Sequence, residues 1–299
     1  MYVVSYFTDA DEALHLGYSH DGHDFVTVNG GRPVLRGMVG TGRLRDPFIG
    51  VGPDGLFHLL ATDGWTSPCI VHATSADLLT WSDQELVPVM AEVAGAHNAW
   101  APEFFPDRRT GLYHLLWSSV VEPGSSAEGR DYEHVGQNHR IWHCTTEDFR
   151  TYSDSALFFD PGHSVIDATV RELDGGGFLM AYKDERGTND LATAHKDLHL
   201  TTFETPGGPY AASTGPVTPS VVEGPSIFRR GDELVMIFDH YLEGRYGAVR
   251  SKDGVDWESV ALTLPPGMRH ASVLETPDLA TLPPRWDDHG ETTAVGRPR

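Results

Sequence analysis

The segment Val222-Glu223-Gly224-Pro225-Ser226-Ile227-Phe228 places one acidic side chain at the start of a short apolar strand, directly before Gly-Pro. The same pattern joins a polar residue to a small residue or proline and then to an apolar strand at Arg45-Asp46-Pro47, Trp100-Ala101-Pro102-Glu103, Ile166-Asp167-Ala168 and Arg269-His270-Ala271. These five segments, called start motifs below, lie roughly 46 to 66 residues apart, the period of a repeat with one four-stranded sheet per unit. They predict an all-β fold, a five-bladed β-propeller.

A second repeated element gives the same count. Five segments are predicted to end a strand and then turn on an aspartate, at Asp21, Asp77, Asp148, Asp197 and Asp253. An aspartate in such a turn bonds the backbone further along, and in four copies an aromatic residue follows that is expected to pack between blades. Two independent patterns therefore predict five repeats.

The two ends of the chain complement each other. The last start motif, at Arg269, is followed by one strand and then by Pro-rich polar sequence, whereas residues 1–30 contain strands without such a motif. We expect the N-terminal strands to complete the fifth blade around the C-terminal strand, which closes the ring and leaves no open edge. The predicted domain covers residues 1–276 and a tail covers 277–299. The segment Val121 to Gln137 is expected to be an insertion on one rim, either a pocket wall or a plain surface loop.

Composition restricts the partners and the compartment. The formal charge of −21 on 299 residues repels phosphate backbones and anionic membrane surfaces, so we expect neither nucleic acid nor membrane binding. No run approaches the length of a membrane helix, and acidic residues interrupt the apolar start, so we expect no export signal. Cys69 and Cys144 do not indicate a disulfide framework, which suits a cytoplasmic protein.

The start motifs also predict a site. The innermost strands of a propeller run along a central channel, and their first residues meet at one mouth of it. Asp46, Glu103, Asp167 and Glu223 are therefore expected to converge. Two or three carboxylates around one cavity suit cleavage of a glycosidic bond, in which one group acts as an acid and another as a base.

These motifs, in this order, resemble glycoside hydrolase family 43, a family of five-bladed propellers that includes arabinofuranosidases, arabinanases and xylosidases. The resemblance extends from the N-terminal strands to Glu275. It implies that Asp46 is the general base that activates water, that Asp167 is a pKa modulator that orients the acid, and that Glu223 is the general acid. The expected activity is inverting hydrolysis of terminal α-L-arabinofuranosyl or β-D-xylosyl residues from oligosaccharides, and the missing export signal and the insertion favour an exo-acting enzyme.

Five further residues are candidates with two interpretations each. Glu103 is expected to bind sugar hydroxyls or to brace the mouth of the channel, and Trp100 to stack on a sugar ring or to pack between blades. Arg45 and Arg269 either contact substrate or neutralise the carboxylates. The resemblance implies that His270 faces a structural calcium ion or a water cluster on the channel axis, and the alternative is a core histidine. No cofactor is expected to be required.

Other functions remain open at this level. The nearest enzymatic alternative is a fructosidase-like or rarer furanosidase propeller, although fructoside-specific relatives normally carry an Asn-Asp-Pro motif and a Glu-Cys motif that this sequence lacks. A carbohydrate-binding propeller without turnover is a second alternative, and a phosphorylase without a recognisable phosphate cradle is a third. Neither the sugar nor the oligomeric state has a signature in these motifs.

Overall fold

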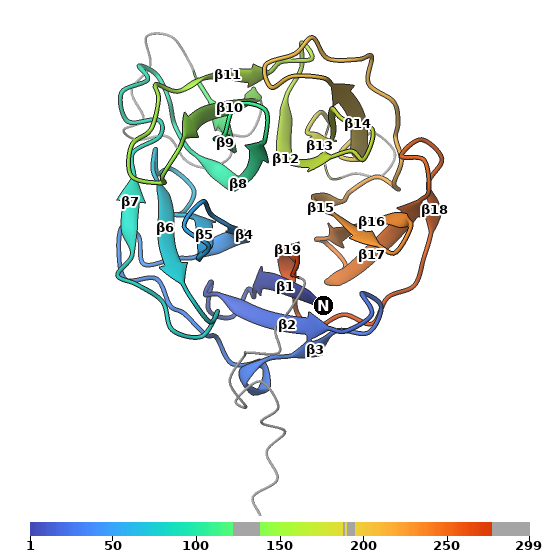
Figure 1. The fold of residues 1–299 in the computed structure, drawn as a ribbon, viewed down its shortest axis with the longest axis horizontal. Helices are drawn as coiled ribbons and strands as arrows, with labels where there is room; N and C mark the ends of the chain where they lie inside the picture. Colours follow the sequence, from blue (N-terminus) through green and yellow to red (C-terminus); the bar gives the residue numbers. More distant parts are fainter. Residues whose placement is uncertain (122–137, 188, 190–194, 277–299) are drawn as a thin grey trace, which may run out of the picture.

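The computed structural model describes residues 1–121, 138–187, 189 and 195–276. Five antiparallel sheets surround a central channel, so the predicted five-bladed propeller is confirmed (Figure 1). Most of the predicted insertion Val121 to Gln137 and all of the predicted tail 277–299 lie outside the described residues.

Each blade is a meander whose first strand borders the channel. Blade one contains β4 (Arg45–Val51), β5 (Phe57–Thr62), β6 (Ile70–Ser75) and β7 (Glu85–Val87). Blade two contains β8 (Trp100–Asp107), β9 (Leu112–Val120), β10 (His139–Thr146) and β11 (Ala156–Phe159). Blade three contains β12 (Val165–Glu172), β13 (Phe178–Asp184) and β14 (Leu198–Phe203). Blade four contains β15 (Glu223–Arg230), β16 (Glu233–His240), β17 (Arg245–Ser251) and β18 (Glu258–Ser259).

The fifth blade closes the ring as predicted. Its innermost strand is the C-terminal β19 (Arg269–Glu275), and its outer strands are β1 (Tyr2–Phe7), β2 (His15–Ser19) and β3 (Val26–Thr27), with the short 3-10 turn η1 (Asn29–Gly31) behind them. β1 pairs antiparallel with β19, from Tyr2 opposite Glu275 to Phe7 opposite Arg269. Because strands β1 and β19 share one sheet, the ring cannot open without breaking backbone hydrogen bonds.

Every innermost strand bulges at the same point. One residue of each start motif has a positive φ, between 35° and 57°, and the register of pairing shifts next to it, at Asp46, Ala101, Asp167, Gly224 and His270. A β-bulge re-aims a side chain at the end of a strand, and left-handed backbone outside glycine is uncommon and mildly strained. The start motifs are therefore bulges that turn side chains toward one mouth of the channel.

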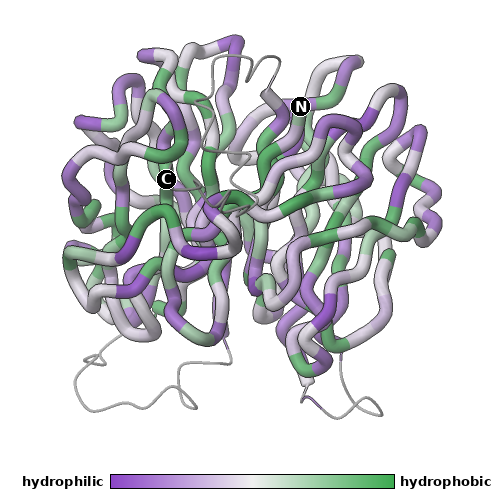
Figure 2. The backbone as a smooth tube through the Cα atoms, turned by 90° about the horizontal axis from the view of Figure 1, so that it is seen from below, coloured by the Kyte–Doolittle hydropathy of each residue, from purple (hydrophilic) through white to green (hydrophobic). Residues whose placement is uncertain are grey.

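The core lies between the blades. Five apolar clusters each join two neighbouring blades, and the one between blades five and one brings together residues such as Val3, Leu16, Ile49 and Leu59. Figure 2 shows hydrophobic stretches passing through the body of the disk and many hydrophilic turns at its rims. Cys69 and Cys144 are free thiols. Among the described residues, no helix is long and apolar enough to span a membrane.

The aspartate turns occur in four of the five predicted places. Asp21, Asp77, Asp148 and Asp253 each accept backbone N–H bonds from residues two and three positions ahead. The aromatic residues that follow pack into inter-blade clusters, as predicted, at Phe25, Trp81, Tyr152 and Trp257.

The fifth predicted turn is wrong. Asp197 precedes strand β14 instead of ending a strand, and its carboxylate binds the His199 ring at 2.9 Å. The Asp-Leu pair imitates the turn motif, but the apolar alternation that forms the strand lies after it, in Leu198–Phe203.

Candidate active site

A cavity of about 230 Å³ at one mouth of the channel is lined by Asp46, Asp167 and Glu223 together. They come from blades one, three and four, each from the start motif of an innermost strand. The expected convergence of these three carboxylates is therefore observed. Their roles as base, pKa modulator and acid stay predictions.

Asp46 is held from two sides. Its Oδ2 accepts a hydrogen bond of 2.7 Å from the Thr62 hydroxyl, and its Oδ1 lies 3.5 Å from His270 Nδ1. The Thr62 hydroxyl itself accepts a bond of 2.8 Å from the Ala101 backbone N–H, so its proton is directed at Asp46. The side chain of Asp46 is 12% exposed and borders the cavity, an orientation suited to a carboxylate that must contact water.

Asp167 lies deeper than Asp46. It is buried, and its Oδ2 accepts a bond of 3.1 Å from the Gly224 backbone N–H, directly beside Glu223. Burial raises the pKa of Asp167 to about 6, helped by the charges of Glu223 and Asp46 and opposed by His270 and Lys183. Asp167 is thus a carboxyl group that changes charge near neutral pH and is fixed to the strand that carries Glu223.

Glu223 is the most accessible of the three carboxylates, with 23% of its side chain exposed. Its Oε2 lies 3.1 Å from Lys183 Nζ, and its Oε1 lies 3.8 Å from a guanidinium nitrogen of Arg269. Two cations from different blades therefore position this carboxylate at the edge of the cavity.

His270 lies in the channel next to the carboxylates. Its Nδ1 is 3.5 Å from Asp46 Oδ1 and 4.0 Å from Asp167 Oδ2. Burial would lower the pKa of His270, but the charges of Asp46, Asp167, Glu223 and Glu103 outweigh it and raise this pKa. The raised pKa favours the charged imidazolium of His270 beside these carboxylates.

The calcium ion implied by the resemblance has few ligands here. Calcium takes six to eight oxygen ligands, whereas among the described residues the carboxylates within 4.0 Å of His270 Nδ1 are those of Asp46 and Asp167. Within the described part of the chain, the one group of three potential metal ligands close together is Asp184, Asp197 and His199, and it excludes His270. Arg186 already binds both oxygens of Asp184. The calcium ion stays a prediction.

Arg45 and Trp100 build one wall of the cavity. The Arg45 guanidinium lies 4.1 Å from the centre of the Trp65 ring and 2.6 Å from Glu12. Trp100 donates its indole N–H to the Trp65 carbonyl at 2.8 Å and packs edge-on to the Trp65 ring. Both predicted residues line the cavity, and their contacts with substrate stay predictions.

Arg269 links three acidic residues. Besides Glu223, it binds Asp239 at 2.9 Å and Asp9 at 2.6 Å. Burial raises the pKa of Asp239 to about 6, together with the charge of Glu223, while Arg269 lowers it. Arg269 therefore compensates negative charge at the cavity, one of its two expected roles.

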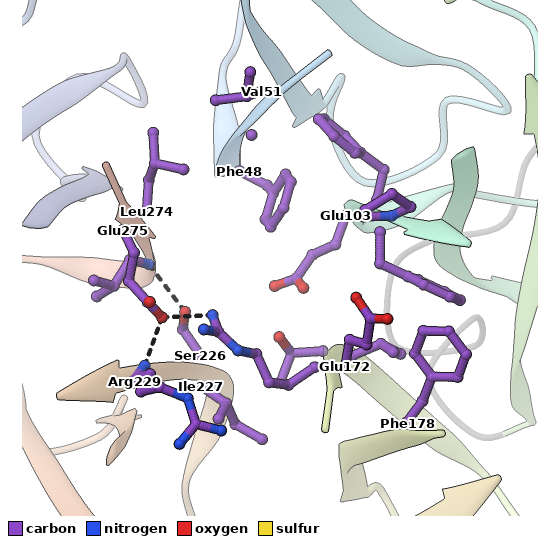
Figure 3. A pocket seen from close by; sticks show the side chains of 18 of the residues that line it. Phe48, Val51, Glu103, Glu172, Phe178, Ser226, Ile227, Arg229, Leu274 and Glu275 are labelled. Atoms are coloured by element: carbon purple, nitrogen blue, oxygen red, sulfur yellow. Dashed lines mark hydrogen bonds and ion pairs between the residues drawn. The ribbon is translucent and has the colours of Figure 1, made fainter. Parts of the chain in front are cut away.

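Glu103 lies outside this cavity. It lines a larger hollow of about 760 Å³ at the opposite mouth of the channel, where its carboxylate points inward (Figure 3). Glu103 stands two residues beyond the bulge, at the level of Phe48 and Thr169, whereas Asp46 and Asp167 occupy the bulge itself. The larger hollow lacks Asp46, Asp167 and Glu223, so we assign the candidate site to the smaller cavity.

Sequence reasoning missed several residues of the cavity wall. Lys183, at the end of β13, contacts Glu223, and Lys196, Glu185, Trp65 and Tyr241 line the same cavity. They come from second strands and loops, which carry no start motif. The available signal was a lysine directly after the apolar and aromatic run 178–182 of strand β13.

An α-L-arabinofuranosidase of Bifidobacterium longum is 27% identical over 202 residues, which are 60% of this chain and 19% of that protein. The chain thus spans about a fifth of the length of this curated relative.

Solved structures share the fold. A family 117 glycoside hydrolase of Zobellia galactanivorans superposes with a TM-score of 0.59 at 18% identity, covering 74% of this chain and 69% of that one. A thermostable family-43 glycoside hydrolase superposes with a TM-score of 0.55 at 15% identity, covering 76% and 78% of the two chains.

The family model described as a probable glycosyl hydrolase domain, related to glycoside hydrolase family 43, matches residues 1–278. Because this match covers nearly the whole chain, the protein belongs to that family of glycosyl hydrolase domains.

Proposed function

We propose that this protein is an inverting, exo-acting glycoside hydrolase that removes terminal α-L-arabinofuranosyl or β-D-xylosyl residues from oligosaccharides. The observation that carries the proposal is the single cavity into which three blades each contribute one carboxylate, Asp46, Asp167 and Glu223. Glycoside hydrolysis requires a carboxyl acid and a carboxylate on opposite sides of the scissile bond.

The contacts of Asp46 and Glu223 support different roles. Asp46 is oriented by Thr62 and takes a proton from the water whose oxygen attacks the anomeric carbon. Glu223, on another blade, donates its proton to the leaving oxygen as the glycosidic bond breaks. Asp46 then releases its proton to solvent and Glu223 recovers one, which completes the cycle. Because water attacks directly, the sugar is released with inverted configuration.

The size of the cavity supports exo action on short chains. Its volume of about 230 Å³ lies below the roughly 300–1,000 Å³ usual for sites that enclose drug-sized ligands. Such a cavity accepts one terminal sugar ring. The similarity to an α-L-arabinofuranosidase supports a pentose as the sugar that is removed.

The experiment is a screen of aryl glycosides of arabinofuranose, xylose and fructose with the wild-type protein and Glu223→Ala. We expect turnover of one pentoside. Glu223→Ala should retain activity on substrates with a good leaving group and lose about 10²–10⁴-fold on natural oligosaccharides, because only the latter need an acid. Cleavage of fructosides alone would identify a fructosidase, and binding without turnover of any glycoside would identify a carbohydrate-binding propeller.

The exo assignment has its own test. Digestion of linear arabinan or xylan, followed by chromatography, should show monosaccharide from the outset and little loss of viscosity. An early ladder of oligomers would contradict it.

A further inference from the structure

Lys183 is a lysine buried in the wall of the candidate site. It is 2% exposed, at the end of β13, and its strand neighbours Phe178 to Tyr182 are buried apolar residues. Its Nζ lies 3.1 Å from Glu223 Oε2 and 2.8 Å from Glu185 Oε2. A buried ammonium is costly unless it is paired, so these two carboxylates account for its place in the core.

The pairing continues beyond Glu185. The second oxygen of Glu185 binds Lys196 Nζ, which gives an alternating chain of Glu223, Lys183, Glu185 and Lys196 along the cavity wall. The Tyr241 ring lies 4.8 Å from Lys183 Nζ and covers it. Burial would lower the pKa of Lys183, but Glu223, Glu185 and Asp167 raise it well above the usual value. Lys183 therefore keeps its charge at every working pH.

Glu223 thus has neighbours of opposite sign. An ammonium at 3.1 Å stabilises a carboxylate, whereas a nearby carboxylate such as Asp167 destabilises it. Glu185 competes with Glu223 for the same ammonium. The titratable and charged groups that face this cluster come from blades one, three, four and five: Arg45, Asp46, Asp167, Asp239, Tyr241, Tyr246, Arg269 and His270.

We propose that Lys183, shared between Glu223 and Glu185, is a positioning residue that sets the pH at which Glu223 gives up its proton. The inference rests on the proposed role of Glu223 as the general acid. Glu185 draws part of the ammonium charge away from Glu223, and Lys196 holds Glu185 in place for this. Lys183, Glu185 and Lys196 thereby adjust the working pH range of the enzyme through Glu223.

The test compares the wild type with variants of Lys183 and Glu185 by the pH dependence of kcat/KM on an unactivated oligosaccharide. Lys183→Met removes the cation beside Glu223, so the alkaline limb of the profile should move upward by about one pH unit or more. Glu185→Gln should move the same limb downward, because Lys183 then pairs with Glu223 alone and a negative charge is lost. Lys183→Arg should restore the limb toward the wild-type position.

The control is Lys252→Met, the same change at an exposed lysine paired with Asp232 on the outside of blade four. It should leave the limb in place. If Lys183→Met fails to fold, the opposite shift in Glu185→Gln still decides the question. Activity lost in both variants with the limb unmoved would show a purely structural role and overturn the inference.

Failure of the proposed function gives a different result. If Glu223 is not the acid, Glu223→Gln will retain the alkaline limb of the wild type. If Glu223→Gln abolishes the limb while Lys183→Met and Glu185→Gln leave it in place, the proposed function stands and this inference fails.

Discussion

Glu103 provides a direct test of the electrostatics of the channel. It is 9% exposed, and burial raises its pKa to about 8 from an ordinary value of 4.5, with a contribution from Asp167. A hydrogen bond with Thr169 and the charge of His270 oppose this rise. At neutral pH Glu103 is therefore an uncharged acid, and Glu103→Gln keeps its size and hydrogen bonding while removing its titration.

The sign and magnitude follow from proton linkage. The folded protein holds a proton on Glu103 that the unfolded chain releases between pH 4.5 and about 8, so the stabilising contribution is complete below pH 4.5 and disappears as the pH rises through 8. At about 1.4 kcal/mol per pH unit, the free energy of unfolding loses at most about 5 kcal/mol over that range through this group. Relaxation and water entry reduce the expected loss to about 2–5 kcal/mol.

The assay is urea unfolding at pH 5, 7 and 8.5. Glu103→Gln should lose less stability than the wild type between pH 5 and 8.5, because the variant has no Glu103 proton to lose, whereas the other titrating groups, among them Asp167 and Asp239 with pKa values of about 6, contribute in both proteins. The control Glu258→Gln changes an exposed carboxylate and should follow the wild type. Parallel curves for wild type and Glu103→Gln would refute the account of Glu103 as a buried neutral acid.

Three further outcomes are expected. Asp46→Asn should lower turnover by about 10²–10⁴-fold while the urea midpoint stays within error of the wild type, and nearly full activity would exclude it as the base. Asp167→Asn should move the alkaline limb of the pH profile to lower pH, because the general acid Glu223 loses a neighbouring negative charge. An unmoved limb would exclude Asp167 as the pKa modulator. Gly224→Ala should lower the free energy of unfolding in urea by about 1–3 kcal/mol more than Gly231→Ala. Both glycines have a positive φ, but a Cβ added at Gly224 lies 3.0 Å from the His270 ring, whereas Gly231 faces open space. Equal losses would show that crowding at His270 contributes nothing.

The five-bladed ring could be predicted from the sequence because the motif that begins each blade is contained in a few consecutive residues. Each start motif combines a polar residue, a bulge and an apolar strand within a few positions, and the bulges at Asp46, Asp167 and Gly224 occur where the motif stands. Strand β1 (Tyr2–Phe7) lies within residues 1–30, where strands without a start motif were predicted. Closure by β19 followed from counting strands.

The sequence does not show how deep in the channel each side chain lies. Glu103 belongs to a start motif, but it follows the bulge by two residues and so faces the opposite mouth from Asp46. Aligning the start motifs on their bulges would have placed Ala101, not Glu103, beside Asp46. The pairing of Lys183 with Glu223 joins two blades, and no local pattern records which second-strand residue meets which start motif.

In the proposed mechanism, Asp46 activates water while Glu223 protonates the leaving oxygen. Proton NMR of the first sugar released from the best substrate of the screen tests it most directly, because the initial anomer is visible before mutarotation. We expect the anomer opposite to that of the substrate, as direct attack by water requires. An initial product with the substrate's own configuration would show a covalent intermediate and contradict the role of Asp46 as the base.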